Sequence, residues 1–261
     1  FRLSDGTVVP DLGFGTYNAK GGDNLQMIKK AIEAGYRYFD TASLYGTERA
    51  LGQALKESGH PREDFILASK AWTDEMGCEE VKAALHRSLY RLQTEYLDLY
   101  LIHWPKQCEE DTDWKRRCQE TWKAMEEMVK EGRIKAIGLS NFLPHHLDVI
   151  LEIATIKPAV NQLELHIGYS QEAAVAYTQS KGILVQAWSP LARGAMEGSL
   201  PSIPVLCLRI FSKIHTSSLM ICSHHNQSLI WMLLIKAISK LNGVVEIHHL
   251  MDVGCSIISV S

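Results

Sequence analysis

Short apolar runs alternate along the chain with longer segments in which apolar residues recur every three or four positions. A short apolar run bounded by turn-forming residues indicates a buried strand, and the longer repeat indicates an amphipathic helix. The strand-like runs are Leu12–Tyr17, Tyr36–Phe39, Phe65–Ser69, Leu97–Ile102, Ile134–Leu139, Ala159–Asn161 and Leu184–Ala187. The helical segments between them are Asn24–Ala34, Glu48–Glu57, Cys78–Leu92, Trp114–Glu131, Pro144–Ile153 and Gln171–Lys181. Strands and helices that alternate in this way predict βαβ units.

Polar or aromatic residues stand where these strands end. The residues at the ends are Asp40, Lys70, His103, Ser140, Asn141, Gln162 and Trp188, and Tyr45 follows Asp40 in the next loop. Such residues at successive strand ends are typical of a (β/α)8 TIM barrel, since all its strands point their carboxyl ends at one rim. We therefore expect an α/β chain of this class, with the strand-end side chains gathered at one mouth.

Both ends of the chain depart from this alternation. Phe1–Pro10 holds Asp5-Gly6 between short β-prone segments, which predicts an N-terminal β-hairpin. Residues 194–261 show few helical periods, and Val244–Ile247 or Ser256–Val260 is the expected eighth strand. No linker divides the chain, so we expect one domain over residues 1–261, with 194–261 as a divergent tail.

Composition and charge narrow the class of protein. The chain has 261 residues, of which 46% are hydrophobic and 22% charged, and a single barrel domain has about 250 residues. A net charge of −3 gives no case for nucleic acid or an anionic membrane, and no apolar run reaches the roughly 20 residues of a membrane span. The first residues do not form a signal peptide, and the six cysteines lack paired spacing. We expect a cytoplasmic monomer with reduced thiols and no nucleic-acid or membrane partner.

Several motifs occur in order between residue 1 and about residue 195. They are Leu12–Tyr17, Phe39–Glu48, Leu97–Pro105, Ile137–Phe142, Asn161–Glu164 and Trp188–Leu191. Together they resemble the aldo-keto reductases, and chance explains several independent motifs in one order poorly. The resemblance implies a barrel plugged at its lower end by the hairpin, which reduces aldehydes and ketones with NADPH. It also implies an eighth strand that ends in a Lys-Ser pair, and the tail contains no such pair.

Four of the residues near the strand ends form a set suited to carbonyl reduction. Hydride transfer to a carbonyl builds negative charge on its oxygen, which a nearby acid must neutralise. A tyrosine, with an ordinary pKa of about 10, is a poor donor unless its anion is stabilised. We assign Tyr45 as the general acid, Lys70 as its electrostatic partner and Asp40 as the anchor of Lys70. His103 directs the substrate carbonyl. In the structural alternative, Asp40 and Lys70 form an ion pair that only stabilises the fold. Tyr45 is then an ordinary aromatic residue of a loop, and His103 is a histidine packed in the core.

The resemblance also implies where a nicotinamide cofactor binds. Ser140, Asn141 and Gln162 match residues that hydrogen-bond the carboxamide, and Trp188 matches the aromatic that stacks on the nicotinamide ring. In the structural alternative, the three polar side chains only cap the strand ends, and the Trp188 indole packs beside them. The expected cofactor residues are Thr16, Asp40, Ser140, Asn141, Gln162, Trp188, Ser189 and Leu191.

Aromatic residues near the strand ends are expected to line the substrate mouth. Tyr17, Trp72 and Trp104 would present apolar surface beside His103, which suits carbonyl compounds with hydrophobic bodies. The structural alternative is that these rings pack in the hydrophobic core. For Trp72 the two interpretations have about equal support from the sequence.

Two functions stay open from the sequence. The first is reduction of carbonyl compounds with NADPH, or with NADH because no tail residue matches the family's phosphate-binding residues. No metal is expected, since Cys222–His225 and His248-His249 fit no known ligand spacing. The second function is a non-catalytic or cofactor-deficient barrel that binds a ligand or partner, in which the divergent tail leaves the eighth strand unformed. A well-paired eighth strand with a basic residue near the adenine end of the cofactor favours the enzyme, and an open barrel edge favours the alternative.

Overall fold

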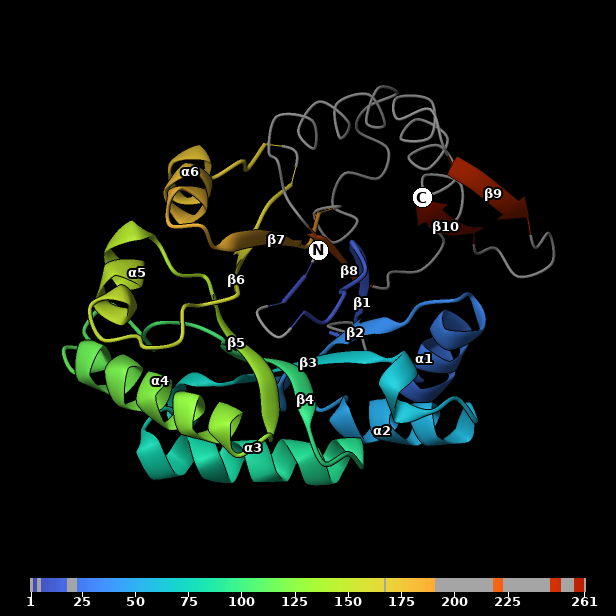
Figure 1. Ribbon diagram of the computed structural model, residues 1–261, viewed down its shortest axis with the longest axis horizontal. Coiled ribbons are helices and arrows are strands. Elements are labelled where there is room, and N and C mark those ends of the chain that lie inside the picture. Colours follow the sequence, from blue (N-terminus) through green and yellow to red (C-terminus); the bar gives the residue numbers. More distant parts are fainter. Residues whose placement is uncertain are drawn as a thin grey trace.

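Eight parallel strands close into a barrel in the computed structural model of the chain (Figure 1). The structure describes residues 2–3, 6–17, 23–166, 168–190, 218–222, 245–249 and 256–260. The barrel strands are β1 (Leu12–Gly15), β2 (Tyr38–Asp40), β3 (Ile66–Ala71), β4 (Leu97–Ile102), β5 (Ile134–Ser140), β6 (Val160–Glu164), β7 (Leu184–Trp188) and β8 (Ser218–Cys222). Each strand pairs with the next, and β8 pairs with β1, so the expected (β/α)8 barrel is confirmed.

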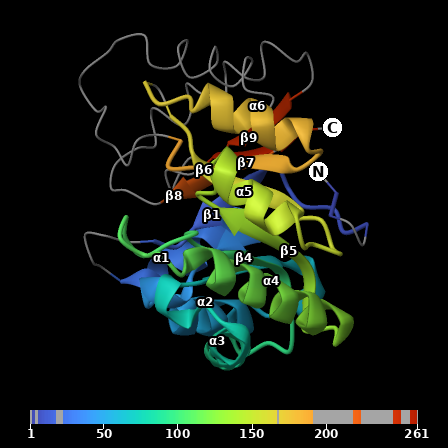
Figure 2. The ribbon, with the colours of Figure 1, turned by 90° about the vertical axis from the view of Figure 1, so that its left-hand side faces the viewer.

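Six α-helices of the described residues lie outside the barrel, and each packs against the next (Figure 2). They are α1 (Asn24–Glu33), α2 (Glu48–Glu57), α3 (Cys78–Leu92), α4 (Trp114–Lys130), α5 (Pro144–Leu151) and α6 (Glu172–Ser180). Helix α1 starts where Asp23 Oδ1 accepts a hydrogen bond from the backbone N–H of Gln26 at 3.1 Å. Short 3-10 helices are η1 (Ser43–Tyr45), η2 (Arg62–Asp64) and η3 (Thr73–Glu75). None of these described helices is long and apolar enough to cross a membrane.

Apolar side chains form one layer outside the barrel wall and another inside it. The outer layer lies between helices and strands and contains fully buried side chains such as Ile28, Leu51 and Trp122. The inner layer joins inward-facing residues of β2 to β6, including Tyr38 and Leu101. Burial of apolar surface on both faces of a parallel sheet explains why its strands read as nearly continuous apolar runs.

The N-terminal segment forms the expected hairpin. Arg2 and Val8 form an antiparallel bridge, and the chain turns at Gly6, whose φ of 88° suits glycine. Leu3 and Val9 are buried against the inner layer near the amino ends of the strands. The hairpin therefore closes the barrel at the end opposite its carboxyl rim.

The expected position of the eighth strand was wrong. Ser218–Cys222 closes the barrel, because it pairs in parallel with Leu12–Gly15 and with Gln186–Ala187. The two expected candidates instead lie in β9 (Val245–His249) and β10 (Ser256–Val260), which pair antiparallel with each other. The connection between them is too short for a parallel crossover, which needs about a dozen residues or more. The open edge that motivated the non-catalytic alternative is therefore absent between β7, β8 and β1.

Three of the six cysteines have described side chains. Cys78, Cys108 and Cys118 form no disulfide. The two histidine-containing clusters considered as metal ligands lie in the tail, where their side chains are outside the described residues.

Candidate functional site

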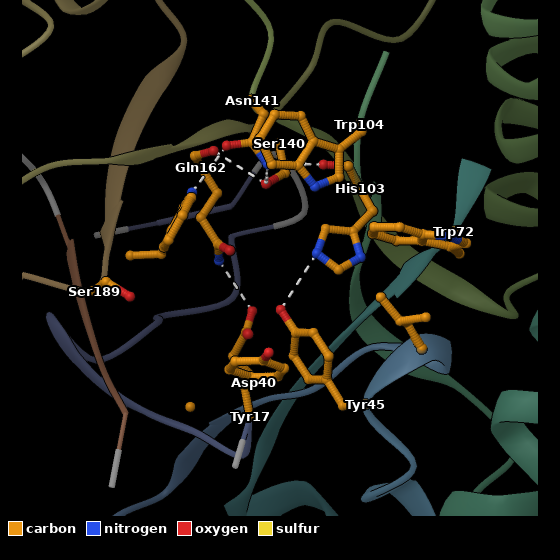
Figure 3. Close-up of a pocket in the computed structure, with 13 residues that line it drawn as sticks. Tyr17, Asp40, Tyr45, Trp72, His103, Trp104, Ser140, Asn141, Gln162 and Ser189 are labelled. Carbon is orange, nitrogen blue, oxygen red and sulfur yellow. Dashed lines mark hydrogen bonds between the residues drawn. The ribbon is translucent and has the colours of Figure 1, made fainter. Parts of the chain in front are cut away.

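A pocket of about 180 Å³ opens at the carboxyl ends of the barrel strands (Figure 3). It is lined by Gly15, Tyr17, Asp40, Leu44, Tyr45, Trp72, His103, Trp104, Ser140, Asn141, Gln162, Trp188 and Ser189. These residues come from the ends of β1 to β7 or from the segments that follow them. Most of the side chains expected from the sequence therefore meet in one pocket, at the rim where barrel enzymes place their chemistry.

Asp40 and Lys70 form a buried ion pair at this pocket. Lys70 Nζ donates a hydrogen bond to Asp40 Oδ1 at 2.5 Å and another to the carbonyl oxygen of Thr41 at 3.0 Å. The two charged side chains are 1% and 5% exposed. In the sheet Asp40 pairs with Ala68, two positions before Lys70, so both side chains point into the barrel. The pairing offsets the cost of burying an ammonium group.

Tyr45 and His103 meet above this ion pair. The Tyr45 hydroxyl lies 3.3 Å from His103 Nε2 (Figure 3). Lys70 Nζ lies 5.1 Å from the centre of the Tyr45 ring. Burial, together with the positive charge of Lys70, lowers the pKa of His103 to about 2. The imidazole is therefore neutral near pH 7 and carries one N–H donor.

A hydrogen-bonded cluster of polar side chains forms another wall. Trp188 Nε1 donates to Asn141 Oδ1 at 3.0 Å, and Asn141 Nδ2 donates to the His103 carbonyl oxygen and to Ser140 Oγ. Asn141 and Ser189 have φ values of 63° and 49°, and each directly follows a strand. Left-handed backbone is uncommon at residues other than glycine, and such strained residues recur at functional sites.

Aromatic rings form the mouth of the pocket. The Tyr17 ring centre lies 5.0 Å from that of Tyr45, and the Trp72 ring packs edge-on against His103 at 4.8 Å. Trp104 is 40% exposed at the rim. All three residues expected at a substrate mouth therefore lie in this pocket.

Two of the expected cofactor residues are not among the lining residues. Thr16 is fully buried, and its Oγ1 lies 2.7 Å from Thr47 Oγ1, whereas Gly15 and Tyr17 on either side line the pocket. Leu191 lies outside the described residues.

Sequence reasoning missed some residues of the site. Leu44 lines the pocket beside Tyr45. The only sequence feature that pointed to Leu44 was its position next to Tyr45 in the loop. Gln186 lies in β7, fully buried, and hydrogen-bonds the lining residue Gln162. Its signal was a polar residue within the apolar run Leu184–Ala187.

Comparisons with known proteins identify what this chain resembles. The model of the Aldo/keto reductase family matches residues 11–204. Glyoxal reductase of Bacillus subtilis is 42% identical over 196 residues, which are 75% of this chain and 68% of the relative. The 9,11-endoperoxide prostaglandin H2 reductase of Trypanosoma cruzi is 41% identical over 199 residues, 76% of this chain and 68% of the relative. A solved Bombyx mori aldo-keto reductase in complex with NADP has a TM-score of 0.76 at 27% identity, covering 93% of this chain and 91% of that one.

Proposed function

The chain belongs to the aldo/keto reductase family, and we propose that it reduces aldehydes and ketones to alcohols with NADPH, using Tyr45 as the proton donor. It is an oxidoreductase that acts on carbonyl and alcohol groups. The observation that carries the proposed residue roles is the convergence of Tyr45, His103 and the Asp40–Lys70 pair on one pocket.

The proposed proton donation follows from these contacts. The Lys70 ammonium lies close to the Tyr45 ring, so it favours the phenolate that forms when the hydroxyl gives up its proton. Asp40 holds Lys70 in place through the 2.5 Å contact. The neutral His103 has its Nε2 toward the Tyr45 hydroxyl, where a carbonyl oxygen in the pocket would lie within reach of both groups.

The polar wall fits a nicotinamide. Ser140, Asn141 and Gln162 offer a hydroxyl and two amides for a carboxamide, and Trp188 supplies an aromatic surface beside them. A bound reduced nicotinamide supplies the hydride. The NADP complex of the Bombyx mori relative supports NADPH as the cofactor, and the preference over NADH is part of the proposal.

The mouth of the pocket supports neutral substrates with apolar bodies. Tyr17, Trp72 and Trp104 present ring surfaces there, and Leu44 adds an exposed aliphatic side chain. Apolar walls with few polar groups are typical of sites for small organic molecules. The cytoplasmic location and the monomeric state stay predictions.

A fluorescence titration tests the proposal. Full-length protein is titrated with NADPH and with NADH while tryptophan emission is followed, and consumption of the bound cofactor is then measured with aliphatic and aromatic aldehydes. We expect saturable binding with NADPH preferred, a weaker signal in Trp188→Ala, and aldehyde-dependent consumption. Folded protein that binds neither nucleotide would overturn the proposal.

A further inference from the structure

A row of buried polar side chains crosses the interior of the barrel behind the pocket. Gln162 Nε2 donates hydrogen bonds to Asp40 Oδ2 at 3.0 Å and to Gln186 Oε1 at 2.5 Å. Gln186 Nε2 in turn donates to the Tyr38 hydroxyl at 2.8 Å. All four residues are buried, with at most 3% of each residue exposed, and they come from β2, β6 and β7. Figure 3 shows the pocket end of this row, where the Gln162 amide points at Asp40.

The carboxylate of Asp40 determines which way each amide in the row faces. One Asp40 oxygen is held by Lys70, and an ionised carboxylate only accepts hydrogen bonds, so Gln162 must present its Nε2 to the other oxygen. The same Nε2 faces Gln186, which must therefore present Oε1. The donor end of Gln186 is then left for Tyr38.

Tyr38 ends the row as a neutral acceptor. Burial, reinforced by the negative charge of Asp40, holds the pKa of Tyr38 far above its usual range, so the hydroxyl stays protonated. Its oxygen accepts from Gln186 and gives that side chain a second anchor, while Asp40 at the other end of the row sets which way the amide faces, since a hydroxyl can donate as well as accept.

The row leaves one atom of Gln162 for the pocket. Both Nε2 protons of Gln162 are engaged, by Asp40 and by Gln186. Within the part of the chain that the structure describes, its Oε1 accepts no hydrogen bond, and Gln162 lines the pocket. Toward a ligand this side chain therefore acts as an acceptor only.

We propose that Gln186 is a positioning residue that fixes the Gln162 amide so that its oxygen accepts from the N–H of a nicotinamide carboxamide. This inference rests on the proposed function. Gln186 itself touches no ligand, and it acts by occupying the second N–H of Gln162. Without it, only the contact with Asp40 orients the amide, and selection for a donor group on the cofactor weakens.

A pair of cofactors that differ at this one group tests the inference. NADP+ carries the carboxamide, and its 3-acetylpyridine analogue carries a methyl group in place of the NH2, so the ratio of their dissociation constants reports the contact with Gln162. Because one hydrogen bond is involved, the wild-type protein should prefer NADP+ by about five- to tenfold. Gln186→Leu should lower this ratio to about twofold or less, measured by quenching of tryptophan fluorescence.

Companion variants separate positioning from general damage. Gln186→Glu keeps an acceptor for Gln162 and should retain the preference. Tyr38→Phe removes only the oxygen that holds Gln186, so it should partly reduce the preference for NADP+ over the analogue. If Gln186→Leu does not fold, Tyr38→Phe still tests whether the row positions Gln162. Thr178→Val is the matched control, because it removes a buried partner of Asn161 on the other face of β6. It should change thermal stability and leave the ratio unchanged.

Two results would overturn the inference, and they are distinguishable. If wild-type protein prefers NADP+ and folded Gln186→Leu and Tyr38→Phe keep the full preference, Gln186 has a structural role only and the proposed function stands. If folded wild-type protein binds neither nucleotide, the proposed function fails and this inference fails with it.

Discussion

Ser43 donates a hydrogen bond to Glu75 Oε2 at 2.5 Å, and this contact joins the two loops that follow the neighbouring strands β2 and β3 at the pocket. Ser43 begins the short helix that ends at Tyr45, and Glu75 ends the one that follows Trp72. The Glu75 carboxylate also accepts from the backbone N–H of Trp72 at 3.0 Å. Glu75, which does not line the pocket, thus links the loop of Tyr45, the proposed acid, to Trp72, the ring proposed to face the substrate.

Removing this carboxylate is expected to impair turnover although the pocket itself is untouched. In Glu75→Ala the loop of Tyr45 and that of Trp72 lose their common partner, and misplacement of about 1 Å can cost up to about 100-fold in rate. We expect kcat to fall by about tenfold or more, with Ser43→Ala showing a smaller fall, in steady-state assays with an aromatic aldehyde. Arg87→Met, which removes only the outer partner of Glu75, serves as the control. Equal kcat values for wild type and Glu75→Ala would show that the link does not position these groups.

Asp40→Asn is expected to destabilise the protein strongly. Lys70 is fully buried, and this substitution leaves its ammonium without a counter-charge. Breaking a buried pair from one side costs about 3–5 kcal/mol, which urea denaturation can measure. Replacing Lys70 by Met in the same chain should restore part of the loss, since no unpaired charge is left. A single variant as stable as the wild type would contradict the buried ion pair.

His103 is expected to make the protein less stable as the pH falls. Burial lowers its pKa from 6.5 to about 2, so between these values the unfolded chain binds a proton that the folded protein does not. Stability is therefore lost as the pH falls through this window, by about 1–2 kcal/mol between pH 7 and pH 5. His146, whose pKa burial lowers to about 4, adds to the same slope.

The change in unfolding free energy between pH 7 and pH 5 should be smaller in His103→Gln. Urea denaturation at the two pH values measures it, and the difference should shrink by about 1–2 kcal/mol. A His60→Gln variant, at an exposed position, is the control. An undiminished pH dependence in His103→Gln would mean that His103 is protonated in the folded protein.

Local periodicity predicted the outer elements of the fold well. Helix Cys78–Leu92 has its expected bounds because its apolar residues repeat at helical spacing between clear ends. The strand expected at Tyr36–Phe39 lies at Tyr38–Asp40 instead, and its acidic end stays inside the strand because Lys70 pairs with it. Strand ends are set by such tertiary partners, which a local pattern does not contain.

Non-local pairing is what the sequence could not specify. Several runs in the tail are apolar enough for a strand, and among the tail segments that the structure describes Ser218–Cys222 is the one that pairs with β7 and β1. The positioning role inferred for Gln186 was equally hidden, because its partners Gln162 and Tyr38 are 24 and 148 positions away. Glu75 carried the pattern of an ordinary surface acid, and its contact with Ser43 spans 32 positions.

The central claim is that Tyr45 donates the proton during carbonyl reduction. A single-turnover measurement tests it most directly: protein loaded with NADPH is mixed with an aldehyde, and loss of the reduced nicotinamide is followed in wild type, Tyr45→Phe and the exposed control Tyr90→Phe. We predict unchanged NADPH affinity in all three and a rate that falls about 100- to 10,000-fold in Tyr45→Phe alone. A Tyr45→Phe rate within about threefold of wild type would contradict the claim, because a general acid typically contributes about 100- to 10,000-fold.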